Sequence, residues 1–375
     1  MIKEPVVYLK GLNGIRAIAA IGVLFSHINL SLKHFGVNNY SLFGFKNSNA
    51  RGWNLGEQGV TMFFVLSGFL ITFLLFKEKE KTNQVDIKKF YKRRILRIWP
   101  LYYFYLGISI ASIILFSDQI PSVGILGFYV FILANIPFII EKALPACDHL
   151  WSIAVEEQFY LFWPHLFKKL NIDTFFKYLL VIFFISVVIR LLLWMFFPFR
   201  LFTVFFTVNR FDCMIFGAIC AIIVIYKPYL RLCIENLFVQ LFAWIIVVIH
   251  FINFEIVNSI VSLEFMTLAT GIIIVGQISA STKIINLEFK LSNLLGKYSY
   301  GIYIYHPLLL FLFAKMNLFA SIENELAKLV VIFGVVVFAT IGIAVISYEV
   351  FEKRFIKLKE NFAIIHSSND SRNKI

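Results

Sequence analysis

The chain has 375 residues, of which 60% are hydrophobic and only 15% are charged, and its mean hydropathy is +0.82. In soluble domains about a quarter of all residues are charged, so this composition excludes an ordinary soluble fold. The formal net charge of +13 does not indicate a nucleic-acid partner, because the basic residues cluster in a few loops between apolar runs. The four cysteines lie at no metal-ligand spacing, and we predict neither a metal site nor a disulfide framework.

Ten apolar runs predict ten membrane-spanning helices in an all-α protein, because about 20 apolar residues cross the hydrocarbon core. The first run holds Arg16 and His27 and is followed by no small-residue cleavage site, so we predict a retained helix rather than a signal peptide. Segment 119–140 is interrupted by Pro and Gly, and we predict an interfacial or re-entrant piece there. The expected helices cover residues 12–30, 58–76, 98–117, 150–167, 175–197, 211–226, 236–253, 259–278, 293–314 and 327–350.

The charged loops predict how these helices are oriented. Four basic segments, "KEKEKTNQVDIKKFYKRR", "KKLNIDTFFK", "KPYLR" and "FEKRFIKLKE", fall on one side if the chain crosses ten times. Loops rich in Lys and Arg remain in the cytoplasm, so we predict that both termini are cytoplasmic. We expect one transmembrane domain over residues 1–360 and a disordered cytoplasmic tail over residues 361–375, which ends in the polar stretch "HSSNDSRNKI".

The first span, "RAIAAIGVLFSH", carries a cation and an imidazole in an otherwise apolar run. A charge at the bilayer centre costs roughly 2.5–3.5 kcal/mol even on lenient scales, so such residues indicate functional sites. Arg16 and His27 are eleven residues apart, which puts them on one helix face and about 16 Å apart along the axis. The alternative is a snorkelling arginine and a packing histidine without chemistry.

The stretch "LWSIAVEEQFYLFWP" places Glu156, Glu157 and Tyr160 in an aromatic helix. Glu156 and Tyr160 are one turn apart on one face, and Glu157 points about 100° away. Adjacent carboxylates rarely face lipid, so we expect a cavity or a cationic partner such as Arg16 or Arg190. An internal ion pair without chemistry is the alternative.

Arg93, Arg94 and Arg97 lie in "YKRRILRIWPLYY", where the first basic loop enters the third span. Guanidinium groups bind phosphate bidentately, so these arginines indicate a phosphate or pyrophosphate site at the membrane interface. The alternative is that they fix the topology and contact anionic lipids.

Two further stretches hold polar candidates. "VNRFDCMIFG" brings Arg210 and Asp212 to the entrance of the sixth span, and "LLGKYSYGIYIYHPLLL" holds Ser299, Tyr303 and His306 in the ninth. Pro307 follows His306 directly and lacks an amide N–H, which loosens the helix. A structural role for His306 is therefore as well supported as a catalytic one.

Taken in order, these segments resemble the bacterial acyltransferase-3 family of membrane O-acyltransferases. In the family, a basic residue and a histidine in the first span are separated by ten residues, and this pair corresponds to Arg16 and His27. The family's Arg-x-x-Arg motif corresponds to Arg94 and Arg97. Its other blocks correspond to "MFFVLSGFLI", to "HLWSIAVEEQFY" with Trp151 and Ser152, to Arg210, Asp212 and Gly217, and to "SYGIYIYHPL". The resemblance covers residues 8 to 355. It implies the stand-alone form, without the SGNH hydrolase-like domain that many members add.

The resemblance implies a multi-pass enzyme of the bacterial inner membrane that transfers an acyl group, commonly acetyl from cytoplasmic acetyl-CoA. The implied acceptor is a hydroxyl on an extracytoplasmic glycan or lipid-linked saccharide, and membrane lipids surround the protein. No permanently bound cofactor is expected. We expect His27 to act as general base or transient acyl carrier, Glu156 to orient it, and Arg16 to hold the donor or stabilise the thioester oxygen.

Two other classes compete with an enzyme. A transporter or flippase of a glycan or anionic substrate also needs intramembrane Arg, Glu and His residues, although the sequence has no repeated halves of the kind that many transporters show. A silent scaffold is the third possibility, and the number of costly polar residues in the spans disfavours it. The residues leave open which acyl group is carried and which glycan accepts it.

Overall fold

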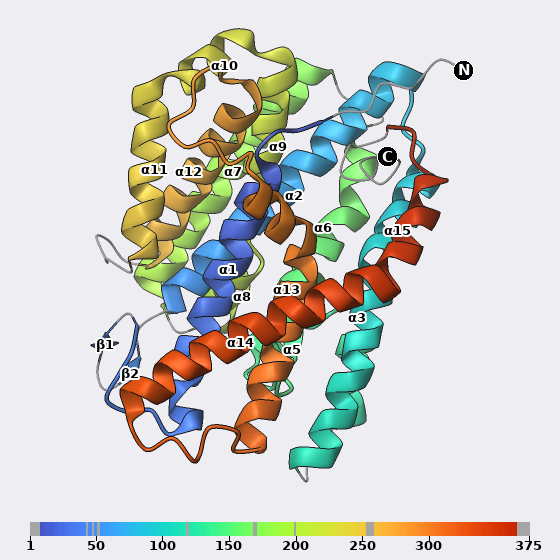
Figure 1. Ribbon diagram of the computed structural model, residues 1–375. Helices are drawn as coiled ribbons and strands as arrows, with labels where there is room; N and C mark the ends of the chain where they lie inside the picture. The colour runs from blue at the N-terminus through green and yellow to red at the C-terminus, as the bar shows by residue number, and fades with distance from the viewer. Residues whose placement is uncertain are drawn as a thin grey trace.

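The computed structural model describes residues 8–365, apart from gaps at 43, 47–48, 51–52, 118–119, 168–170, 199 and 253–258. Its helices confirm the predicted all-α class, and all ten expected helices are present (Figure 1). Most keep to within a few residues of the expected bounds, but α3 begins eleven residues earlier than expected, at Ile87, and α2 extends five to six residues beyond both expected ends. They are α1 (Leu12–Ser31), α2 (Trp53–Thr82), α3 (Ile87–Ser117), α6 (Trp151–Leu166), α7 (Ile172–Phe196), α9 (Phe211–Tyr226), α11 (Leu237–Phe251), α12 (Ser259–Ser279), α13 (Lys290–Lys315) and α14 (Glu325–Ser347).

Shorter elements that the hydropathy pattern did not predict connect these helices. Strands β1 (Phe45–Lys46) and β2 (Asn49–Ala50) form a small antiparallel hairpin. The short helices are η1 (Leu32–Phe35), α4 (Val123–Val130), α5 (Asn135–Ile139), η2 (Asp148–Leu150), α8 (Leu201–Val208), α10 (Pro228–Glu235), the π-helical turn η3 (Tyr348–Glu352) and α15 (Lys353–Glu360). Of the tail predicted to be disordered, residues 361–375, the part 366–375 lies outside the described residues, whereas the carbonyls of Phe362 and Ile364 accept hydrogen bonds from Arg93 and Lys81.

Segment 119–140 is broken, as the sequence indicates. Its described part forms α4 and α5, which are separated by a turn in which Ile132 has a φ of 57°. A helix of eight residues is only about 12 Å long, so neither piece can cross a bilayer alone. The prediction that this segment is interfacial or re-entrant stays a prediction.

By length and composition, seven described helical segments could cross a membrane, or eight if the bent pair α10 and α11 is one span. This is fewer than the ten expected crossings. Helix α6 has only 16 residues, and α13 is long enough but carries Ser, Tyr, Gly and His in its sequence. The bundle remains that of a multi-pass membrane protein, in which these two helices bring polar side chains to its interior.

The basic loops gather at one end of the bundle, which we call the basic end. Side chains connect them there: Tyr226 Oη donates to Glu80 at 2.7 Å, and Lys79 Nζ donates to the carbonyl of Phe167 at 3.0 Å. The start of α1 and helix α15 lie at this end, and the β1–β2 hairpin lies at the other, which we call the hairpin end (Figure 1). The four basic segments therefore share one side, as their charge predicted.

Helices α2 and α9 pack backbone against backbone in the centre of the bundle. A Cβ atom placed on Gly68 of α2 would lie 1.9 Å from Met214 O, and one on Gly217 of α9 would lie 2.0 Å from Val65 O. Only glycine permits these reciprocal contacts, because neither neighbouring atom belongs to a flexible side chain. The glycines of "FFVLSGFLI" and "RFDCMIFG" are thus explained by one helix crossing.

We therefore expect Gly68→Ala to lower the free energy of unfolding by about 1–3 kcal/mol or more, since overpacking forces the two helices apart. The measurement is the thermal midpoint of the purified protein in detergent. Gly107→Ala in α3 is the matched control, because nothing lies within 4 Å of a Cβ atom there. An unchanged midpoint for Gly68→Ala would show that α2 and α9 do not pack in this way.

Candidate active site

Three cavities with shared walls run between the basic end and the hairpin end. The arginine cavity, of about 140 Å³, shares Val60 and Tyr303 with a middle cavity of about 50 Å³. The middle cavity shares His27 and Asp148 with a hairpin-end cavity of about 570 Å³. Most residues expected to be functional lie along this row, and His27 stands where its second and third cavities meet.

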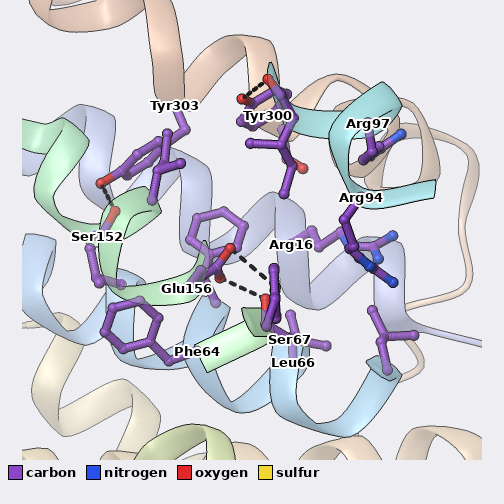
Figure 2. Close-up of a pocket in the computed structure, with 17 residues that line it drawn as sticks. Arg16, Phe64, Leu66, Ser67, Arg94, Arg97, Ser152, Glu156, Tyr300 and Tyr303 are labelled. Carbon is purple, nitrogen blue, oxygen red and sulfur yellow. Dashed lines mark hydrogen bonds between the residues drawn. The ribbon is translucent and has the colours of Figure 1, made fainter. Parts of the chain in front are cut away.

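The arginine cavity brings together side chains from α1, α3 and α6 (Figure 2). Arg16, Arg94 and Arg97 gather on one side of it, and Ser152 and Tyr303 lie on the other (Figure 2). Its lining also includes the expected residues Glu156, Tyr160 and Ser299. Three guanidinium groups face a single carboxylate, so the cavity suits an anionic ligand with phosphate groups.

The structure corrects the expected role of Glu156. Its carboxylate accepts hydrogen bonds from Ser67 Oγ at 2.6 Å and from Tyr160 Oη at 3.3 Å, inside the arginine cavity. His27 lines the other two cavities and not this one. Glu156 therefore does not orient His27, because the side of α6 that carries it faces α2 at a different depth of the bundle.

Two expected site residues, Arg93 and Glu157, have structural partners outside the cavity. Arg93 pairs with the buried carboxylate of Glu78 at 2.7 Å and donates to the carbonyl of Phe362 at 3.0 Å. Glu157 accepts from Trp99 Nε1 at 2.8 Å. Neither side chain lines the arginine cavity, because each points away from Arg94 and Glu156 around its helix. Of the three expected donor-binding arginines, the structure brings Arg94 and Arg97 to the cavity.

His27 meets another histidine from the far end of the sequence. Its Nδ1 lies 2.9 Å from Nε2 of His306, and Nδ1 of His306 lies 3.1 Å from the carbonyl oxygen of Ile302. His306 is completely buried, whereas His27 opens to two cavities. The structure thus joins two candidates that are 279 positions apart.

Tyr303 lines both the arginine cavity, with Ser152, and the middle cavity, with Trp151 and His27. Tyr303 Oη donates to the carbonyl of His149 at 2.9 Å and lies 2.6 Å from Ser152 Oγ. Trp151 lines the middle cavity with Tyr303. These bonds fix the start of α6 against α13, so that the wall of the middle cavity is rigid.

Two residues of this site were not predicted, Asp148 and His149. Asp148 lines both cavities that His27 lines, and His149 lines the middle one. Partial burial raises the pKa of a carboxyl group, but the His149 side chain and backbone N–H, together with His27, hold the pKa of Asp148 below its ordinary value. Asp148 is therefore the carboxylate that can balance a positive charge on His27. The letters "DHLWS" were the available signal, since Asp148 and His149 begin the motif that holds Trp151 and Ser152.

The hairpin-end cavity is wide and partly polar. His34, Lys315 and Ser117 line it with His27 and Asp148, beside the apolar wall of α13. Hydroxyl-rich molecules bind to such mixed surfaces through hydrogen bonds to ionisable and hydroxyl groups. Within the described residues, no group of three or more His, Cys, Asp or Glu side chains could hold a metal ion.

Arg210 and Asp212 lie outside these three cavities. Asp212 pairs with the buried Arg190 of α7, which also binds Glu264 of α12, and Arg210 Nη1 donates to Thr61 Oγ1 of α2 at 2.8 Å. The structure thus does not bring these two residues together with the other candidates, and a site role for them stays a prediction. The buried charges instead connect α9 to three neighbouring helices.

We expect Asp212→Asn to lower the free energy of unfolding by about 3 kcal/mol, because it leaves the buried Arg190 with one counter-charge fewer. Thermal denaturation in detergent measures this loss. Asp173→Asn is the control: Asp173 pairs with Lys227 at the surface, and exposed pairs contribute little. If Asp212→Asn kept its midpoint but lost donor binding, the residue would belong to the site after all.

A multi-pass helical bundle, with cations at one end of a row of cavities and paired imidazoles farther along it, defines a class of membrane proteins with polar cavities inside the bundle, which can serve either group transfer or transport. Family membership distinguishes transfer from transport. The family described as an acyltransferase domain, acyltransferase 3, matches residues 9–349. The chain belongs to this family.

Relatives of known name cover only part of the chain. It is 33% identical over 181 residues to "O-acetyltransferase OatA" of Staphylococcus aureus strain NCTC 8325 / PS 47, across 44% of this chain and 27% of that protein. OatA of strain COL matches with the same identity and coverage. The chain thus aligns with about a quarter of the length of these relatives. No solved structure matches the chain with statistical significance.

Proposed function

We propose that this protein is an integral membrane O-acetyltransferase of the bacterial inner membrane. In this proposal, the protein moves an acetyl group from cytoplasmic acetyl-CoA to a hydroxyl of an extracytoplasmic or lipid-linked glycan. The observation that carries the proposal is the row of three adjoining cavities, with arginines at one end and His27 at the junction of the other two. The names of the O-acetyltransferase relatives support the choice of acetyl.

The donor enters from the basic end, which the positive-inside rule assigns to the cytoplasm. Arg94 and Arg97 bind the phosphates of the nucleotide, and the pantetheine arm extends past Glu156 and Tyr303 toward the middle cavity. Arg16 holds the donor rather than the reacting oxygen, since eleven helical residues place it about 16 Å from His27 along the axis. Tyr303 and His149, in the walls of the middle cavity, lie closer to where charge develops.

The acceptor occupies the hairpin-end cavity with its hydroxyl toward His27. His27 takes the hydroxyl proton while the oxygen attacks the thioester carbonyl carbon, and a C–O bond forms as the C–S bond breaks. The imidazolium then returns its proton to the departing thiolate, so that the products are the acetyl ester and free CoA. Asp148 balances the transient positive charge on His27.

The test is transfer of labelled acetyl from acetyl-CoA to glycan in membranes that contain the protein. We expect ester-linked label, released by mild alkali, and none in membranes without the protein. Mass spectrometry of envelope glycans with and without the protein then identifies the acceptor. Movement of a substrate across the membrane without any transfer of label would favour the transporter or flippase instead.

A further inference from the structure

The contact between His27 and His306 also constrains where the hydrogens on the two imidazole rings lie. The three partners form a line, from the carbonyl of Ile302 through His306 to His27, in which each step is 3.1 Å or 2.9 Å long. One end of this line is a backbone carbonyl, which can only accept a hydrogen bond. The direction of every bond in the line follows from that constraint.

The proton positions can be assigned from the carbonyl outward. Because Ile302 O only accepts, Nδ1 of His306 carries the hydrogen and donates it. A neutral imidazole has one donor and one acceptor, so Nε2 of His306 carries a lone pair. Nδ1 of His27 then donates to that lone pair, which leaves the lone pair of neutral His27 on Nε2. A base or nucleophile at His27 needs this nitrogen, since Nδ1 is occupied by His306.

The local helix is built to hold His306 in this state. A carbonyl oxygen has two lone pairs, so Ile302 O can accept from the imidazole ring in addition to its helical donor. Pro307 offers no N–H to the carbonyl one turn earlier, which loosens the helix at this turn. The ring is completely buried, and its centroid lies 4.9 Å from that of His27 and 5.6 Å from that of His149. Rotation of the ring would break both bonds.

We propose that His306 is a positioning residue that fixes His27 as the tautomer with hydrogen on Nδ1 and its lone pair on Nε2. An unconstrained histidine favours the opposite tautomer, so this choice must be imposed by the surroundings. Asp148, His149 and His306 are the titratable groups that act on His27 from nearby, and His34 and Lys315 share the hairpin-end cavity with it. Among the described residues, His306 is the one whose side chain bonds to His27 Nδ1. The consequence for transfer rests on the proposed function, whereas the tautomer itself does not.

The first experiment measures the tautomer without reference to activity. The full chain, labelled with ¹⁵N-histidine, is placed in lipid bilayers, and the His27 signals are assigned by comparison with His27→Gln. We expect a protonated, pyrrole-type Nδ1 and an unprotonated, pyridine-type Nε2. In His306→Leu the pattern should reverse, with hydrogen on Nε2. A wild-type His27 with hydrogen on Nε2, or one that His306→Leu leaves unchanged, would overturn the proposal.

The second experiment measures transfer of label from acetyl-CoA in the same samples. The wrong tautomer should reduce transfer by about 10²–10⁴-fold in His306→Leu. His306→Gln should retain more activity, because its amide oxygen can accept from His27 Nδ1. Equal loss in both variants, without a change of tautomer, would assign His306 to packing alone.

The chain offers a matched control in His250. This histidine is also buried, and its Nδ1 lies 2.7 Å from the carbonyl of Ile246, four residues earlier in α11. His250→Leu removes the same kind of bond from a helix that lines none of the three cavities, and it should leave both the His27 tautomer and label transfer unchanged. If wild type shows the expected tautomer but no transfer at all, the proposed function fails while the positioning role stands.

Discussion

Replacement of His27 by alanine should reduce acetyl transfer by about 10²–10⁴-fold, the range that a general base contributes. His27 and Asp148 both line the middle and the hairpin-end cavities, and His27 is the member of this pair whose imidazole can take the hydroxyl proton. The measurement is ester-linked label in membranes with equal amounts of each protein. Binding of acetyl-CoA should remain unchanged, because His27 does not line the arginine cavity.

His165→Ala is a suitable control for this effect. His165 lies near the end of α6 beside Tyr91, at 3.2 Å, and lines none of the three cavities. The His165→Ala protein should transfer label from acetyl-CoA at the wild-type rate. Full activity in folded His27→Ala would exclude both roles considered for His27, as base and as acyl carrier.

Replacement of Arg94 and Arg97 by glutamine should raise the apparent KM for acetyl-CoA by about 10–100-fold, since hydrogen bonds to charged groups contribute about 1.5–3 kcal/mol. Both side chains line the arginine cavity, whereas the adjacent basic residues do not. S-acetylpantetheine, which has no phosphate, should be used equally well by the variant and by wild type. The contrast between the two donors separates phosphate binding from any general damage to the protein.

The matched control removes two other charges from the same basic loop. Lys88→Gln with Lys89→Gln changes the net charge and any contact with anionic lipids equally, but both lysines are exposed. This variant should keep the wild-type KM. If it raised KM as much as the arginine variant, the arginines would act through topology or lipid contact, as the alternative interpretation of this stretch holds.

Much of the fold could be predicted because helix formation in a membrane protein depends on local hydropathy. Each of the ten expected helices appears, and the segment at 119–140 is broken as expected, although the break between α4 and α5, residues 131–134, contains neither Pro nor Gly. The number of crossings was less predictable. Helix α13 keeps polar side chains on the side that lines the cavities, and these lower its hydropathy below that of a helix that faces lipid.

The sequence predicted which residues line the candidate site better than it predicted which residues bond to one another. The side-chain types and spacings pointed to Arg16, His27, Arg94 and Arg97, all of which line the row of cavities. The spacing of residues along the chain does not predict which side chains pair. Glu156 bonds to Ser67, and Arg93 pairs with Glu78. Asp148 is the carboxylate that shares the middle cavity with His27. Each of these depends on which helix faces are neighbours.

The sequence by itself determined the class of fold, the grouping of the basic loops at one end of the bundle, and the placement of Arg16 and His27 on one helix face at different depths. These follow from hydropathy and from the fixed rise and rotation of an α-helix. Only the tertiary structure decided that His27 meets His306, 279 positions away. Such a pairing depends on how closely α1 and α13 approach each other, for which Gly296 of α13 leaves room beside the backbone of Asn13. No local pattern in either helix encodes which residue lies across that contact.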